Sequence, residues 1–125
     1  MERKTILIAE TNKPQDKFIK DALIRNKANI YIFDTEPLNS EEMKNAILEL
    51  KPDIVITNER KRDKPATDVI REIQKDKTIK QPIFILISGY ERNNIKYILN
   101  KDNIIAHLIS KPYDYDELAN YIKAI

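Results

Sequence analysis

The sequence lacks cysteine altogether and holds a single glycine and a single histidine among its 125 residues. Without cysteine there is no disulfide bond, no thiol nucleophile and no cysteine-ligated metal. The one histidine, His107, cannot build a histidine-rich zinc site. It lies among apolar residues, so we expect it to be packed and hydrogen-bonded. The one glycine, Gly89, excludes the glycine-rich loops that bind phosphate groups.

The chain also has little net charge and no long apolar run. Its 22 basic and 20 acidic residues give a formal net charge of +2, which argues against a general nucleic-acid binder. The first apolar run, residues 6–9, is too short for a signal peptide or a membrane span. An apolar content of 42% with 34% charged residues is typical of a globular protein. We therefore expect one cytoplasmic domain, residues 1–125, with no nucleic-acid or membrane partner.

Short apolar runs rich in β-branched residues recur along the chain. Such runs are typical of strands that are buried on both faces, as in parallel sheets covered by helices. The strongest is the segment 52–58, in which a proline precedes the run and a charged loop follows it. The predicted strands are residues 5–9, 30–33, 54–57, 83–88 and 104–109.

Between these runs, apolar residues repeat at helical spacing. In the first helix Phe18 belongs to the expected inward face, together with Ile19, Ala22 and Leu23. Asn39 or Ser40 is expected to cap the second helix, with Glu42 completing a capping box. Asp114 and Glu117 form a similar start to the last helix. Strand and helix alternate five times, which predicts a parallel sheet with helices on both faces.

Polar residues follow the ends of these strands. Ligands bind at the carboxyl ends of the strands in open α/β sheets, so these residues are the candidate site. In chain order the residues are Glu10, Thr11, Asn58, Ser88 and Lys111.

The same positions carry a resemblance to a known family. Residues 52–58 are similar to the pattern Pro-Asp-x-Val-x-x-Asp except at Asn58, Ser88-Gly89 matches a hydroxyl and small-residue pair, and residues 111–113 resemble Lys-Pro-Phe. From end to end the chain resembles the CheY-like receiver domain of response regulators. The resemblance implies a flavodoxin-like (βα)5 three-layer sandwich, a parallel five-stranded sheet in the order 2-1-3-4-5, and a place in two-component phosphorelay signalling.

The departures from this pattern fall on the chemistry. Asn58 replaces the phospho-acceptor aspartate, and an amide cannot act as the nucleophile that accepts a phosphoryl group. Glu10-Thr11 replaces an acidic pair, although magnesium sites are usually anchored by carboxylates. We expect Glu10 and Lys111 to form an ion pair in place of metal and phosphate, and Ser88 to hydrogen-bond locally. These departures predict a pseudo-receiver that is not phosphorylated, with no enzymatic activity, metal or other cofactor.

The resemblance also implies where a partner binds. In the family, the fourth helix, fifth strand and fifth helix form the usual dimer or partner face. Five of the six tyrosines lie in the last third of the chain, and they could either pack half-buried or form such a face. Leu108 stands where the family usually has an aromatic switch residue. The candidate face residues are Tyr90, Tyr97, Tyr113, Tyr115 and Tyr121.

Two other hypotheses are compatible with the same architecture. One is a phosphorylatable receiver that uses a divalent metal and another acceptor, although we expect Asp53 at the wrong end of its strand, Asp63 in a mobile loop and Thr57 pointing away. The other is a flavodoxin-like cofactor binder, which is weaker because Glu10 would repel a phosphate. The basic loop at residues 60–64 is interpreted as a solvated loop, with an anion- or partner-binding edge as the alternative.

Overall fold

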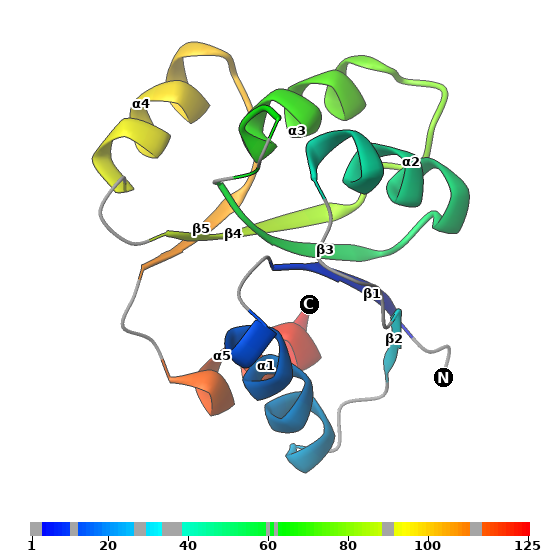
Figure 1. Ribbon diagram of the computed structural model, residues 1–125, viewed down its shortest axis with the longest axis vertical. Helices are drawn as coiled ribbons and strands as arrows, with labels where there is room; N and C mark the ends of the chain where they lie inside the picture. Colours follow the sequence, from blue (N-terminus) through cyan, green and yellow to red (C-terminus); the bar gives the residue numbers. More distant parts are fainter. Residues whose placement is uncertain are drawn as a thin grey trace.

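A computed structural model describes residues 4–10, 13–26, 30–33, 39–59, 61, 63–88, 92–110 and 114–125. Strands and helices alternate along the chain and form an α/β fold with a parallel sheet (Figure 1), which confirms the predicted class. The elements are β1 (Lys4–Ala9), α1 (Lys13–Arg25), β2 (Ile30–Phe33), α2 (Ser40–Leu50), β3 (Ile54–Asn58), α3 (Ala66–Lys75), β4 (Ile83–Ser88), α4 (Arg92–Lys101), β5 (His107–Ser110) and α5 (Tyr115–Ala124).

The sheet has the strand order β2-β1-β3-β4-β5, and every pair is parallel. β1 and β3 lie side by side in a register that runs from Ile6 opposite Ile54 to Ala9 opposite Thr57. Their carboxyl ends therefore meet at one edge of the sheet, next to the end of β4. This is the edge where a parallel α/β sheet offers a ligand site.

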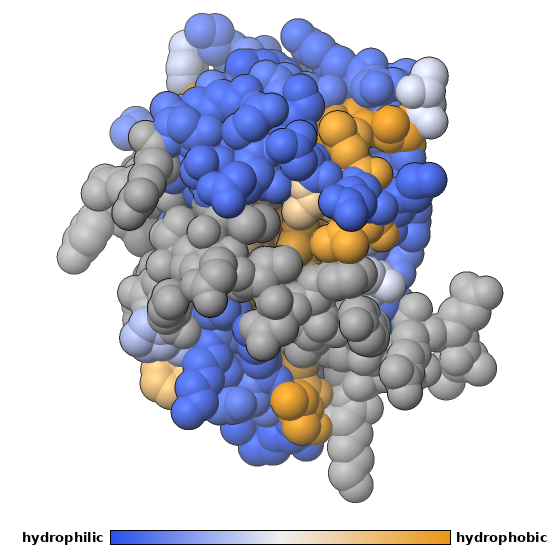
Figure 2. All heavy atoms as spheres, turned by 45° about the vertical axis from the view of Figure 1, so that its right-hand side comes forward, coloured by the Kyte–Doolittle hydropathy of each residue, from blue (hydrophilic) through white to orange (hydrophobic). Residues whose placement is uncertain are grey.

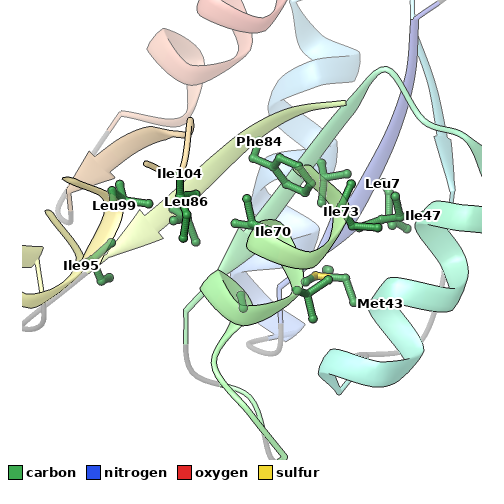
Figure 3. Packing of buried hydrophobic residues seen from close by; sticks show 14 residues of the cluster. Leu7, Met43, Ile47, Ile70, Ile73, Phe84, Leu86, Ile95, Leu99 and Ile104 are labelled. Carbon is green, nitrogen blue, oxygen red and sulfur yellow. The ribbon is translucent and has the colours of Figure 1, made fainter. Parts of the chain in front are cut away.

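Helices cover both faces of the sheet. α2, α3 and α4 lie on one face, and α1 and α5 lie on the other (Figure 1). Successive strand residues alternate between two cores, so that Val55 packs beneath α2–α4 and Ile54 and Ile56 pack against α1 and α5. Figure 3 shows the first core, in which Phe84 lies among side chains from both the sheet and its helices. Burial on both faces is the physical reason that each strand reads as a continuous apolar run.

The predicted helix caps at Asn39 and Asp114 are confirmed. Asn39 Oδ1 accepts a hydrogen bond from Glu42 N at 2.8 Å, and Asn39 N donates to Glu42 Oε1 at 3.4 Å, which completes the capping box of α2. Asp114 Oδ1 accepts from the backbone N–H groups of Asp116 and Glu117 at the start of α5. These side chains satisfy helix amides that otherwise have no partner within the helix.

The predicted strand at 104–109 is wrong over its first three residues, because β5 begins only at His107. α4 instead ends in a closed turn, in which Asn103 has a left-handed backbone (φ 55°) and Ile104 N donates to Leu99 O at 2.9 Å. This is the geometry of a Schellman motif, which brings the residue after the turn back onto the helix. Ile104 packs in the core beneath α2–α4, which explains its apolar side chain without a place in a strand.

Two side chains lie more exposed than the sequence predicts. Phe18 was expected on the inward face of α1 but is 51% exposed, and its ring contacts Tyr115 of α5 with centroids 5.5 Å apart. His107 is exposed because β5 is the edge strand, so its expected packing among apolar residues is wrong. Its expected hydrogen bond is confirmed, since Nδ1 lies 2.7 Å from the Tyr121 hydroxyl.

Candidate functional site

The carboxyl ends of β1 and β3 place two of the predicted site residues at one edge. Glu10 directly follows β1 and is 2% exposed, and Asn58 is the last residue of β3 and half-buried. Ser88 ends β4, one strand further along, but its side chain lies outside the described part of the structure. Thr11 and Lys111 also lie outside the described residues, so the predicted pair of Glu10 with Lys111 stays a prediction.

A residue that the sequence did not single out lies at the centre of this edge. Lys61, three positions after Asn58, donates from Nζ to Asn58 Oδ1 at 2.7 Å and also to the carbonyl oxygen of Ala9. Ala9 ends β1 and Asn58 ends β3, so one ammonium group joins the ends of two adjacent strands. We refer to Ala9, Glu10, Asn58 and Lys61 as the carboxyl-edge site.

The charge on Lys61 is balanced by nearby carboxylates. Burial lowers the pKa of Lys61 from 10.5 to about 8, and the attraction of Glu10 is the largest effect that opposes this lowering. Asp63 and Glu59 oppose it as well. The ammonium therefore remains predominantly protonated at neutral pH, facing one carbonyl oxygen, one amide oxygen and the field of Glu10.

Glu59 anchors the start of the loop that carries Lys61. Its side chain is buried, and its two carboxylate oxygens accept from Thr67 N and Thr67 Oγ1, both at 2.8 Å. Its carbonyl oxygen accepts from Ala66 N at 2.9 Å. The N-cap of α3, Pro65, makes no side-chain capping bond, so Glu59 provides the acceptor for the start of this helix. A carboxylate there also interacts favourably with the helix dipole.

Asp63 lies in the loop between β3 and α3, as expected, and it attaches this end of the loop to α2. Its carboxylate accepts from Ser40 N at 2.8 Å and Glu41 N at 3.1 Å. These bonds, that of Ser40 first, lower the pKa of Asp63 from 3.8 to about 2. The hydroxyl of Ser40 in turn donates to the carbonyl oxygen of Lys64. The loop is thus attached at both ends, to α3 through Glu59 and to α2 through Asp63.

The basic loop is not simply a solvated one. Lys61 lies in the carboxyl-edge site, and Lys64 Nζ pairs with Glu72 of α3 at 2.9 Å. Glu72 also pairs with Lys44 of α2 at 3.1 Å, which links the two helices. Arg60 and Arg62 lie outside the described residues.

Hydrophilic atoms cover most of the upper part of the face in Figure 2, and hydrophobic atoms show only in small separate areas.

The carboxyl-edge site does not fit the magnesium ion that the receiver resemblance implies. Magnesium needs near-octahedral oxygen ligands and usually one or more carboxylates. Here the oxygens of Asn58 and Ala9 already accept hydrogen bonds from Lys61. Within the described ranges, no group of three or more histidine, aspartate or glutamate side chains could hold a metal ion.

The alternative acceptors are held in other bonds. Asp53 lies at the amino end of β3, where its carboxylate accepts from Thr5 N at 2.7 Å and Lys80 Nζ at 2.6 Å. These bonds, Lys80 first, lower the pKa of Asp53. Thr57 is fully buried and its hydroxyl donates to the Asn58 carbonyl oxygen at 2.8 Å. Asp53 is therefore at the wrong end of the strand, as predicted.

The tyrosines of the predicted partner face divide into three groups. Tyr97 on α4 is 66% exposed and Tyr121 on α5 is 38% exposed. Tyr115 is half-buried and packs toward α1, while Tyr90 and Tyr113 lie outside the described residues. Leu108 packs, partly buried, against the core beneath α2–α4.

In the parts of the chain that the structure describes, no helix has the length and apolar character needed to cross a membrane.

No family model matches the sequence, and no curated protein matches it. Solved structures do match in fold. A response regulator receiver domain protein (CheY-like) from Methanospirillum hungatei JF-1 has a TM-score of 0.77 at 18% identity, covering 98% of this chain and 93% of that one. A DNA-binding response regulator of the LuxR family from Staphylococcus aureus has a TM-score of 0.78 at 20% identity, covering 97% of each chain. The phosphorylated cyanobacterial phytochrome response regulator RcpA has a TM-score of 0.75 at 18% identity, covering 98% and 91%.

Proposed function

We propose that this chain is a pseudo-receiver, a domain with the receiver fold that takes up no phosphoryl group and acts through protein contacts in two-component-type signalling. The observation that carries the proposal is Asn58, an amide at the carboxyl end of β3 whose oxygen holds the Lys61 ammonium at 2.7 Å. Phosphoryl transfer to a receiver needs a carboxylate nucleophile, a divalent ion and a balancing cation. An amide cannot be the nucleophile.

Other acceptors do not supply a better mechanism. Asp53 is bonded to Thr5 and Lys80 at the opposite end of β3, and Asp63 is bonded to the first amides of α2. Thr57 is fully buried, and its hydroxyl donates to the Asn58 carbonyl oxygen. A divalent ion would be needed beside any of them, and the carboxyl-edge site already holds an ammonium group.

The test is incubation of the wild-type chain with acetyl phosphate and magnesium, followed by intact-protein mass spectrometry. We expect no added phosphoryl group, because the nucleophile and the metal ligands are both missing. RcpA, whose structure was solved in its phosphorylated form, is the positive control for the donor. A wild-type chain that gains one phosphoryl group at Asp53, Thr57, Asp63 or another edge residue would overturn the proposal.

The proposed partner or homodimer surface lies on α4, β5 and α5. Tyr97 and Tyr121 present exposed rings there, and Ile105, just before β5, is 78% exposed. Exposed aromatic side chains are enriched among residues that dominate binding energy. β5, between these helices in the proposed surface, is the edge strand of the sheet. The proposal therefore rests on the position of this strand as well as on the tyrosine content.

Replacing Tyr97 and Tyr121 with alanine is expected to weaken self-association or partner binding by about tenfold or more, because each ring would be an anchor of the contact. Sedimentation and pull-down with the intact gene product measure this. Leu48→Ala is the matched control, since Leu48 is 38% exposed on α2, which α3 separates from α4 (Figure 1). Equal association of the double variant and the wild type would remove this surface from the proposal.

A further inference from the structure

We propose that Lys61 is a built-in cation that replaces the divalent ion at the carboxyl-edge site, so that this site binds its own ammonium group and no magnesium. The inference rests on the proposed function only in that it treats the site as one that carries no phosphoryl group. It adds the group that occupies the site and explains why an isolated change at Asn58 would not reactivate it.

The contacts of Lys61 are those of a bound cation. Its Nζ donates to a strand-end carbonyl oxygen, that of Ala9, and to the amide oxygen of Asn58 at 2.7 Å. Glu10, buried next to Ala9, attracts the ammonium and opposes the effect of burial on its charge. An ammonium group can donate three hydrogen bonds and needs acceptors when it is buried. Two strand ends and one carboxylate supply such surroundings.

The ammonium is also a tethered ion, which gives it an advantage over an ion from solution. A group held within the same chain competes at a high effective concentration. The tether is short and its ends are fixed, because Glu59 bonds to Thr67 of α3 and Asp63 bonds to Ser40 and Glu41 of α2. Little conformational freedom is then lost when Lys61 enters the site. Magnesium, by contrast, gives up its water ligands reluctantly.

A neutral amide at position 58 fits this arrangement better than a carboxylate would. Glu10, Asp63 and Glu59 already place negative charge around the ammonium, and Asn58 contributes an acceptor without adding a further negative charge. The two strands are joined at their carboxyl ends by a bond that does not depend on any solute. The site is thereby held in one arrangement whether or not magnesium or phosphodonor is present.

The first measurement is the melting temperature of Lys61→Met beside that of Lys64→Met. Methionine keeps most of the side-chain stem but removes the charge and its donors. We expect Lys61→Met to melt about 5–15 °C below the wild type, because buried acceptors and Glu10 lose their cation. Lys64→Met is the matched control from the same loop; its ion pair with Glu72 is partly exposed, so a shift below about 5 °C is expected. Equal shifts in the two variants would overturn the inference.

The second measurement is chemical rescue. Lys61→Ala leaves a space for a small cation, so propylammonium chloride should restore part of the lost melting temperature, whereas sodium chloride at the same concentration should not. Lys64→Ala should show no such recovery. If Lys61→Ala does not fold in plain buffer, refolding with and without propylammonium gives the same readout. Recovery that is equal with sodium chloride would contradict a specific ammonium site.

The third measurement separates this inference from the proposed function. Magnesium should leave the melting temperature of the wild type unchanged, and stabilisation by magnesium at millimolar concentration would overturn the inference. Phosphorylation of the wild type in the mass assay, with propylammonium rescue intact, would overturn the proposed function and leave the Lys61 cation standing. If the wild type stays unphosphorylated but Lys61→Met melts like Lys64→Met, the Lys61 inference is overturned and the proposed function stands.

Discussion

A variant with aspartate at both Thr11 and Asn58 should still bind magnesium poorly, and removal of the Lys61 ammonium should then raise its affinity for magnesium about a hundredfold or more. The double variant adds two carboxylates to that of Glu10. The resulting three carboxylates are the ligand set that the receiver resemblance implies. Lys61 would nevertheless remain among them, three residues from position 58 and already bonded to it. A unit charge about 4 Å from an ion costs several kcal/mol even at an effective dielectric constant of about 20. Thr11→Asp/Asn58→Asp/Lys61→Ala is therefore the variant in which metal binding is expected to appear.

Isothermal titration with magnesium or manganese measures this difference, and intact mass after treatment with acetyl phosphate tests whether phosphoryl transfer follows the metal. The matched control is Thr11→Asp/Asn58→Asp/Lys64→Ala, which removes a neighbouring lysine of the same loop and has the same net charge. Only the variant without Lys61 should gain affinity. Equal affinities in the double variant and both triple variants would show that Lys61 does not exclude the metal.

The sequence was sufficient for the fold class because burial leaves a clear pattern. Residues 54–56 are consecutive apolar residues, and the structure shows that they alternate between two cores on opposite faces of the sheet. Such a run is required only where both faces are covered, so it identified a parallel sheet with helices on each side. The local caps at Asn39 and Asp114 were also readable, because each acts on amides two or three residues away.

The features that the sequence did not predict depend mostly on contacts between residues that are distant in sequence. Ile104 looked like part of a strand but closes the end of α4 and enters the core. Phe18 fits the inward stripe of α1, yet it lies at the border with α5, where Tyr115 covers one side of its ring. Asp63 caps a helix that begins 23 residues before it in the chain. No local pattern reports the core neighbours of Ile104, the contact of Phe18 with Tyr115 or the helix amides that Asp63 binds.

The candidate site was predictable in its location but incomplete in its residues. Glu10 and Asn58 follow from the rule that parallel strands end at a shared edge, and both lie there. Lys61 follows Asn58 by three residues, which was the available signal, but a lysine in a charged loop is usually solvated. Its direction depends on where Glu59 and Asp63 attach the loop, and those attachments are tertiary.

The electrostatic partner of Glu10 can be identified by double-mutant cycles. We expect Glu10→Gln and Lys61→Met each to lower the free energy of unfolding, since either change removes one of two attracting charges, that of buried Glu10 or that of half-buried Lys61. The double variant should lose less than the sum of the two losses, with a coupling energy of about 1–3 kcal/mol. Urea unfolding followed by circular dichroism at neutral pH, where Lys61 carries its charge, measures all four proteins.

Two further cycles make the assignment specific. Glu10→Gln with Lys64→Met should be additive within about 0.5 kcal/mol, because the Lys64 ammonium is engaged with Glu72 on α3. Glu10→Gln with Lys111→Met tests the pair that the receiver resemblance predicted. Coupling to Lys61 alone assigns the built-in cation as the partner of Glu10, and coupling to both lysines makes the site a three-charge cluster in which Glu10 is shared. Strict additivity of Glu10 with Lys61 would contradict their attraction and leave the Asn58 amide and the Ala9 carbonyl as the groups that hold the ammonium.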